Sequence, residues 1–234
     1  MAEESLLDRD TALSLLRPPQ HDVATHNLQH SWSDNRFPLF GEPFLRVWDR
    51  FSGSQPDDNG CMESRSSRQR LDTRTSRKKS LAIHADYEIW KPTPYISFTT
   101  SAARIRRLVA LRIERRGPQT LSVINPNARI ANQLPILDMR AEMNYYGIVD
   151  PYPRSFQYYT DEYLCLWEVT PQEIVGQWQW ADLVRNDQWY NEIILPAFKE
   201  HNKRLESTSL EEETLGLSAA FHELSGLFLA LGRL

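Results

Sequence analysis

The strongest strand signal in this chain is an apolar run between positions 162 and 169, made of Tyr163, Leu164, Cys165, Leu166, Trp167 and Val169. Shorter β-rich segments accompany it at residues 43–48, 95–100, 120–124 and 175–180. Helical spacing of apolar residues occurs between and around them, at residues 4–16, 101–116, 135–144, 187–204 and 209–232. Short strands interspersed with helices predict an α+β fold, and 234 residues suit one domain or one domain with appendages.

The distribution of charge adds a second constraint. The net charge is only −4, but residues 61–120 carry 14 Lys and Arg against 5 Asp and Glu, a local balance of +9. Such a block predicts a partner that carries phosphates, although a solvated loop and helix face give the same pattern. The candidates for nucleic-acid contacts are Arg74, Arg77, Lys78, Lys79, Arg104 and Arg107. Part of the block lies in residues 52–79, which have almost nothing to bury and predict a basic flexible loop.

Other classes of protein are disfavoured by what the sequence contains. Cys61 and Cys165 are too few for a disulfide framework and have no zinc-ligand spacing, so no metal site is expected. We find no glycine-rich phosphate loop, no HExxH and no GxSxG pattern. The first ten residues are acidic where a signal peptide is basic, and no apolar run approaches the ~20 residues that span a membrane. We therefore expect a soluble, cytoplasmic protein without a membrane partner.

Three short segments belong together. They are FLRVWDR (44–50), YISFTTSAA (95–103) and DEYLCLWEVTPQEIVGQW (161–178). Their order and content resemble the Arg–Ser–Glu class of ADP-ribosyltransferases, which includes the cholera-like and pierisin-like toxins, and VTPQEIVG at 169–176 is the most specific match. The resemblance covers about residues 43–180. It implies a split β-sheet core at 43–186, preceded by an N-terminal helix and connection at 1–42 and followed by C-terminal helices at 187–234.

The resemblance also implies a site and a substrate. Arg46 matches the arginine that braces the phosphates of NAD and the cleft wall, Ser97 the hydroxyl that orients a catalytic carboxylate, and Glu162 that carboxylate. Cleavage of the bond to nicotinamide builds positive charge on the ribose, which a fixed carboxylate stabilises. A guanidinium matches a diphosphate in bidentate geometry. Further substrate-binding candidates are Thr99, Thr160, Tyr95 and His84.

The chain departs from the family pattern at three points. Phe98 interrupts the Ser-Thr-Ser motif, and the spacing from Glu162 to Pro171 is one residue longer. Thr160 stands where the family has an acid or amide that activates the acceptor. Threonine has no carboxylate for that task.

Three functions therefore stay open. The first is an enzyme that transfers ADP-ribose from NAD to an acceptor. The second is an RNA-linked transferase that uses aminoacyl-tRNA, of the kind represented by fungal arginine-containing cyclodipeptide synthases, in which the basic block binds tRNA and no cofactor is needed. The third is a catalytically decayed fold that acts as a binding module, which Thr160 favours.

Overall fold

The computed structural model describes residues 6–17, 30, 32–33, 37–152 and 159–208. The chain falls into two compact units, Met1–Phe198 and Lys199–Leu234. In the second unit, residues 199–208 are helical. The expected helix at 209–232 lies outside the described residues, so the following paragraphs concern the first unit.

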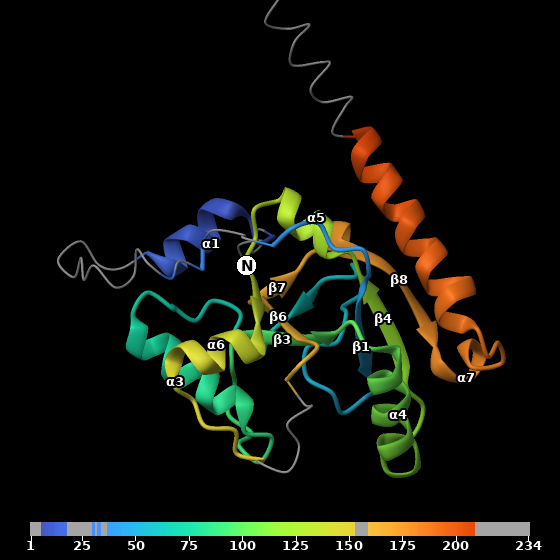
Figure 1. Ribbon diagram of the computed structural model, residues 1–234, viewed down its shortest axis with the longest axis horizontal. Coiled ribbons are helices and arrows are strands. Elements are labelled where there is room, and N and C mark those ends of the chain that lie inside the picture. The colour runs from blue at the N-terminus through green and yellow to red at the C-terminus, as the bar shows by residue number, and fades with distance from the viewer. Residues whose placement is uncertain (1–5, 18–29, 31, 34–36, 153–158, 209–234) are drawn as a thin grey trace, which may run out of the picture. The chain divides into compact units, whose positions relative to one another are not determined.

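A six-stranded antiparallel sheet forms the centre of the first unit (Figure 1). Its strands lie in the spatial order β5-β6-β3-β1-β4-β8. Their bounds are β1 (Phe44–Trp48), β3 (Tyr95–Thr99), β4 (Thr120–Ile124), β5 (Ile136–Asp138), β6 (Glu162–Leu166) and β8 (Ile174–Gln179). A separate two-stranded sheet pairs β2 (Met62–Glu63) with β7 (Glu168–Val169). The α+β class expected from the sequence is confirmed.

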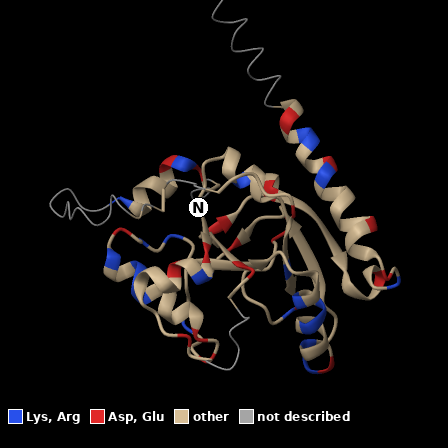
Figure 2. Ribbon diagram, in the orientation of Figure 1, with Lys and Arg blue, Asp and Glu red and all other residues tan. Residues whose placement is uncertain are grey.

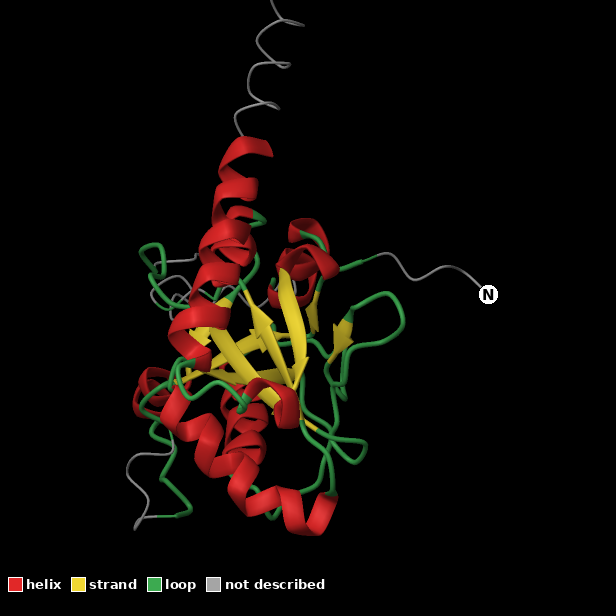
Figure 3. Ribbon diagram, turned by 90° about the vertical axis from the view of Figure 1, so that its right-hand side faces the viewer, coloured by secondary structure: helices red, strands yellow, loops and turns green. Residues whose placement is uncertain are grey.

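Helices surround this sheet, as Figure 3 shows. Their bounds are α1 (Arg9–Leu16), α3 (Arg74–Ala85), α4 (Ala102–Arg116), α5 (Pro126–Ala131), α6 (Met139–Tyr146), α7 (Trp180–Leu183), the 3₁₀ turn η1 (Pro171–Glu173) and the π-helix η2 (Tyr190–Ile194). Buried side chains of α4 and α7 pack on β1 and β4, and those of α1, α3 and α6 pack around β6. Figure 1 shows α3 and α6 grouped together, with α4 on the other side of the view.

The helices can be compared with those expected from the sequence, and α4 is confirmed together with the residues that mark its two ends. Helix α4 begins after Ser101, whose hydroxyl accepts a hydrogen bond from the Arg104 amide at 3.2 Å. It ends at Gly117, which has a positive φ of 78°. The expected helix at 135–144 is wrong in its first residues, because Ile136 and Leu137 pair with β6 as strand β5 before α6 begins. The helix expected over 187–204 begins in the first unit at η2 (Tyr190–Ile194), a few residues later than expected.

The strand expected over 162–169 is interrupted at Trp167. This residue adopts a φ of 60°, and the chain leaves the main sheet there. Its amide donates to the Pro94 carbonyl at 2.7 Å, and its carbonyl accepts from the Ser64 amide at 2.6 Å. The run therefore divides into β6 and β7, which belong to different sheets.

The flexible loop expected over 52–79 is wrong for residues 74–79, which form the first half of α3. Thr73 and Ser76 make a capping box, in which the Thr73 hydroxyl accepts from the Ser76 amide at 3.0 Å. Before the helix, the Leu71 amide donates to the Leu15 carbonyl at 2.9 Å. The buried side chains of Leu71 and Leu81 anchor the segment in the core.

Across the residues that the structure describes, every helix is too short or too polar to span a lipid bilayer.

Candidate functional site

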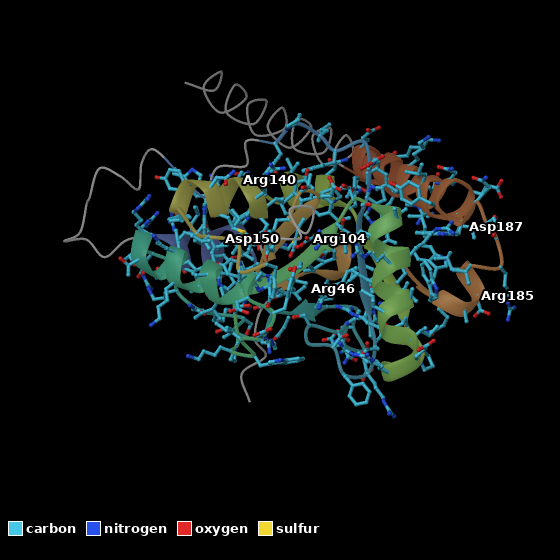
Figure 4. All side chains as sticks on the ribbon, turned by 60° about the horizontal axis from the view of Figure 1, so that its bottom comes forward. Arg46, Arg104, Arg140, Asp150, Arg185 and Asp187 are labelled. Atoms are coloured by element: carbon cyan, nitrogen blue, oxygen red, sulfur yellow. The ribbon has the colours of Figure 1, made fainter. Side chains whose placement is uncertain are left out.

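A cavity of about 1020 Å³ opens in the first unit, between the sheet, helix α4 and the segment that connects α3 to β3. The loop at residues 51–54 and Tyr152 complete its wall. Figure 4 labels two residues of the wall, Arg46 of β1 and Arg104 of α4. The cationic residues of the wall are Arg46, Arg65, Lys91, Arg104, Arg112 and Arg116, and the carboxylates are Asp86, Glu88 and Glu162. This excess of positive charge favours an anionic ligand.

Arg46, Ser97 and Glu162 all line this cavity. They come from β1, β3 and β6, which are neighbours in the sheet. In the register of β3 and β6, Thr99 lies opposite Glu162. One Arg46 nitrogen, Nη1, donates to the Ser97 carbonyl at 3.1 Å. The three sequence motifs thus meet in one place although they are far apart along the chain.

Arg46 connects two parts of the cavity wall. Its Nη2 donates to the Gly53 carbonyl at 2.7 Å, in addition to the bond from Nη1 to β3. Its Nε is buried and has no hydrogen-bond partner among the described residues. Burial, and then the charge of Arg112, lower the pKa of Arg46 to about 10. An anion placed nearby would stabilise the charged form of this guanidinium.

Glu162 is only 3% exposed and is held by two partners. The Arg104 guanidinium donates to Oε2 at 2.7 Å, and the Tyr87 hydroxyl donates to the same oxygen at 3.4 Å. Burial, and then the charge of Glu162, raise the pKa of Tyr87, so its hydroxyl stays protonated. Arg104, expected to contact nucleic acid, instead turns toward this carboxylate and has a side chain that is 17% exposed.

His84 lies against Ser97 rather than on the surface. Its Nε2 is 2.8 Å from Ser97 Oγ, and its Nδ1 is 2.8 Å from Thr93 Oγ1. Burial, and then the charges of Arg46 and Arg65, lower the pKa of His84 to about 3. The imidazole is therefore neutral at physiological pH, where one ring nitrogen donates and the other accepts. The resemblance implied that Ser97 orients the carboxylate, but its hydroxyl is paired with His84 here.

The depressed pKa of His84 predicts a specific dependence of stability on pH. Below pH 6.5 the unfolded state takes up a proton that the folded state does not, so stability falls as pH decreases. Between pH 7 and pH 5, we expect the free energy of unfolding of the native protein to fall by about 2 kcal/mol more than that of His84→Gln. Urea titrations at both pH values measure the difference. Equal losses, or a His84 imidazole resonance that titrates between pH 5 and 8, would contradict the neutral state of His84.

The remaining substrate-binding candidates divide into two groups. Thr99 and Tyr95 line the cavity, where the Thr99 hydroxyl accepts from the Ser101 amide at 3.1 Å and the Tyr95 ring packs edge-on against His84. Thr160 is exposed and does not line the cavity, and its hydroxyl accepts from Arg140 of α6 at 3.4 Å. The structure therefore does not place Thr160 with the other substrate-binding candidates.

The expected nucleic-acid contacts are only partly on the surface. Figure 2 shows the Lys and Arg of α3 and α4 in blue. Arg77 is buried, donates to the carbonyls of Leu71 and Leu16, and lies 4.9 Å above the Trp32 ring. Its assignment to nucleic acid is therefore wrong, since it closes the C-terminal end of α1. The exposed candidates are Arg74, Lys78, Lys79 and Arg107.

The sequence did not assign several residues of the wall to the site. Tyr87 and Trp90 carry no motif signal, and Arg65, Arg112 and Arg116 counted only as part of the basic block. The spacing of Arg104, Leu108, Arg112 and Arg116 by four residues could have indicated one helical face, because such residues align along a helix. No group of His, Cys, Asp and Glu within the described ranges is arranged to hold a metal ion.

The family comparison bears on the same region. A family model described as a domain of unknown function, DUF7587, matches residues 42–183, more than half of the chain. The chain belongs to DUF7587. The DUF7587 region contains all cavity-lining residues, from Leu45 to Glu162, so the candidate site lies wholly within it. No curated protein matches the chain.

Proposed function

We propose that this chain is a transferase with an ADP-ribosyltransferase-like fold, which cleaves NAD and transfers ADP-ribose to an acceptor. The observation that carries the proposal is the meeting of Arg46, Ser97 and Glu162 in one cavity, on three neighbouring strands. The cavity volume of about 1020 Å³ is at the large end for small-molecule sites, which suits a dinucleotide. Its excess of guanidinium groups suits a diphosphate.

Arg112 is the guanidinium best suited to the diphosphate. In the described part of the chain it forms no ion pair, and its Nη1 donates to the Val47 carbonyl at 3.3 Å. The neighbouring carboxylate of Asp49 is bonded to Arg116 at 2.9 Å. Burial, and then the charge of Arg116, lower the pKa of Arg112. A phosphate placed here would relieve the repulsion between these arginines.

In the proposed reaction, Glu162 stabilises the positive charge that develops on the ribose. The bond between C1′ and the nicotinamide nitrogen breaks, and its electron pair leaves with nicotinamide. A bond forms between C1′ and the nucleophilic atom of the acceptor, whose proton passes to solvent. The ion pair with Arg104 fixes the direction of the Glu162 carboxylate before the substrate binds. Thr160 lies outside the cavity, so activation of the acceptor by this position is not part of the proposal.

A matched pair of arginine variants on α4 tests the proposal. We expect Arg112→Gln to weaken the binding of NAD about 10- to 100-fold, because it removes charge-assisted hydrogen bonds to phosphate. Arg107→Gln removes the same charge from the same helix at an exposed position outside the cavity, and should change affinity less than twofold. Calorimetric titration of NAD into each folded protein measures both values.

The same proteins distinguish the RNA-linked alternative. The structure uses Arg77 and Arg104 internally, which leaves fewer exposed cations for a polyanion than the sequence suggested. Binding of tRNA that falls by about 0.7–0.9 log units per phosphate contact for each log unit of salt would favour that alternative. In that case Arg107→Gln or Lys78→Glu should weaken tRNA binding while Arg112→Gln leaves it unchanged. Equal affinity of the native protein and Arg112→Gln for NAD would contradict the proposed binding of the NAD diphosphate by Arg112.

A further inference from the structure

Helix α4 gives the cavity two distinct ends. Arg104, Arg112 and Arg116 all line the cavity from one face of this helix. Because each residue rises 1.5 Å, the first and last of them are separated by about 18 Å along the helix axis. Arg104 holds Glu162 at one end, and Arg116 bonds to Asp49 at the other. Beyond the diphosphate position proposed at Arg112, no ligand group has yet been placed at the end away from Glu162.

Three exposed aromatic side chains line the cavity: Tyr87, which bonds to Glu162, and also Phe51 and Trp90. Phe51 is 56% exposed and Trp90 is 74% exposed. The Phe51 amide donates to Oδ1 of Asp49 at 2.8 Å, the same oxygen that accepts from Arg116. Phe51 therefore belongs to the Arg116 end of the cavity. Arg50 lies over the Phe51 ring at 4.5 Å.

Arg65 ties the loops that carry these two rings together. Its guanidinium donates to the carbonyls of Trp90 at 3.3 Å and Lys91 at 3.0 Å. Its aliphatic stem packs against Gly53, where an added Cβ would lie only 2.9 Å from the Arg65 Cδ. The absence of a side chain at Gly53 allows this close approach. The rings are thus carried by two fixed loops on one side of the cavity, near its cationic wall.

We propose that Phe51 and Trp90 form a subsite for a nucleobase, the base of the nucleoside that is not cleaved. Large exposed aromatic rings beside guanidinium groups suit a planar base attached to a phosphate, because every base has a face that can stack. Along α4, Glu162 lies at the Arg104 end and Phe51 at the Arg116 end, and Arg112 lies between these ends, so the proposed substrate extends along the helix. The identity of the ligand as the adenine nucleoside of NAD rests on the proposed function.

Binding of three probes to alanine variants tests this subsite. We expect Trp90→Ala and Phe51→Ala to weaken the binding of ADP-ribose and NAD about 5- to 100-fold, the range for loss of one stacked base. Nicotinamide mononucleotide lacks the second nucleoside, so its affinity should stay within about twofold. Trp90→Phe keeps a ring and should recover most of the affinity. Leu111→Ala removes an exposed apolar side chain of α4 outside the cavity and is the control.

The outcomes separate this inference from the proposed function. Unchanged affinity for ADP-ribose in both alanine variants, or an equal loss for nicotinamide mononucleotide, would overturn the subsite and leave the proposed function standing. Ring-dependent binding of ADP-ribose by a native protein that never cleaves NAD would support the subsite and overturn the proposed function. A native protein that binds none of the probes at millimolar concentration would overturn both.

Discussion

Replacing Glu162 with glutamine is expected to lower the rate of NAD cleavage at least about 100-fold. Glutamine keeps the size and shape of the side chain but removes the charge that stabilises the developing positive charge on the ribose. Its carbonyl can still accept the hydrogen bond from Arg104, so the melting temperature should change little. The measurement is the initial rate of nicotinamide release, together with a thermal melt of each protein.

A second carboxylate of the cavity wall provides the control for this variant. Glu88 lines the same cavity but lies on the exposed segment between α3 and β3. Glu88→Gln removes one negative charge from the wall and should leave the rate within about threefold of the native protein. A normal rate in Glu162→Gln, or equal losses in the two variants, would show that Glu162 has a structural role only.

The largest expected effect on stability is at Glu173, in the VTPQEIVG segment. This carboxylate and the Arg129 guanidinium are both fully buried, 2.9 Å apart. Arg129 also donates to the carbonyls of Glu168 and Leu166, which fixes the end of β6 and the start of β7. Glu173→Ala leaves the buried guanidinium without a counter-charge. We expect a loss of about 3–5 kcal/mol and a melting temperature lower by roughly 6–20 °C.

An exposed ion pair in the same unit provides the comparison. Asp182 and Arg185 are 3.2 Å apart, with side chains that are 67% and 79% exposed. Asp182→Ala should lower the free energy of unfolding by less than about 1 kcal/mol, because water screens the pair. Chemical denaturation of both variants measures the difference. A loss at Glu173 no larger than that at Asp182 would contradict the structural role of the buried pair.

The fold was predictable where local signals agree with tertiary packing. Helix α4 shows this best, because a serine cap, an apolar stripe and a terminal glycine all mark the same segment. Trp167 shows the opposite case, since nothing in its apolar run indicates that the backbone turns to a positive φ between two sheets. Helix α3 was missed because its capping box lies in a polar sequence and its buried side chains are few.

The candidate site was predictable to the extent that it rests on strand motifs. The shared position of Ser97 and Glu162 could be expected because each occupies a recognisable strand, and antiparallel pairing brings the two strands together. The partners of these residues were not predictable. Arg104 and Arg77 look alike in a charge pattern, but Arg104 bonds to a buried carboxylate and Arg77 to the backbone carbonyls of Leu16 and Leu71. Which partner each arginine binds depends on the packing of elements that are distant in the sequence.

The most direct test of the proposed function is to incubate the purified native protein with NAD and follow the nicotinamide resonances by proton NMR. We expect free nicotinamide to accumulate, with ADP-ribose appearing on an acceptor or in solution, and we expect Glu162→Gln to suppress this release. Binding of NAD without any release would indicate a decayed site that retains only recognition. NAD that stays intact and unbound at millimolar concentration would contradict the assignment of this cavity to NAD.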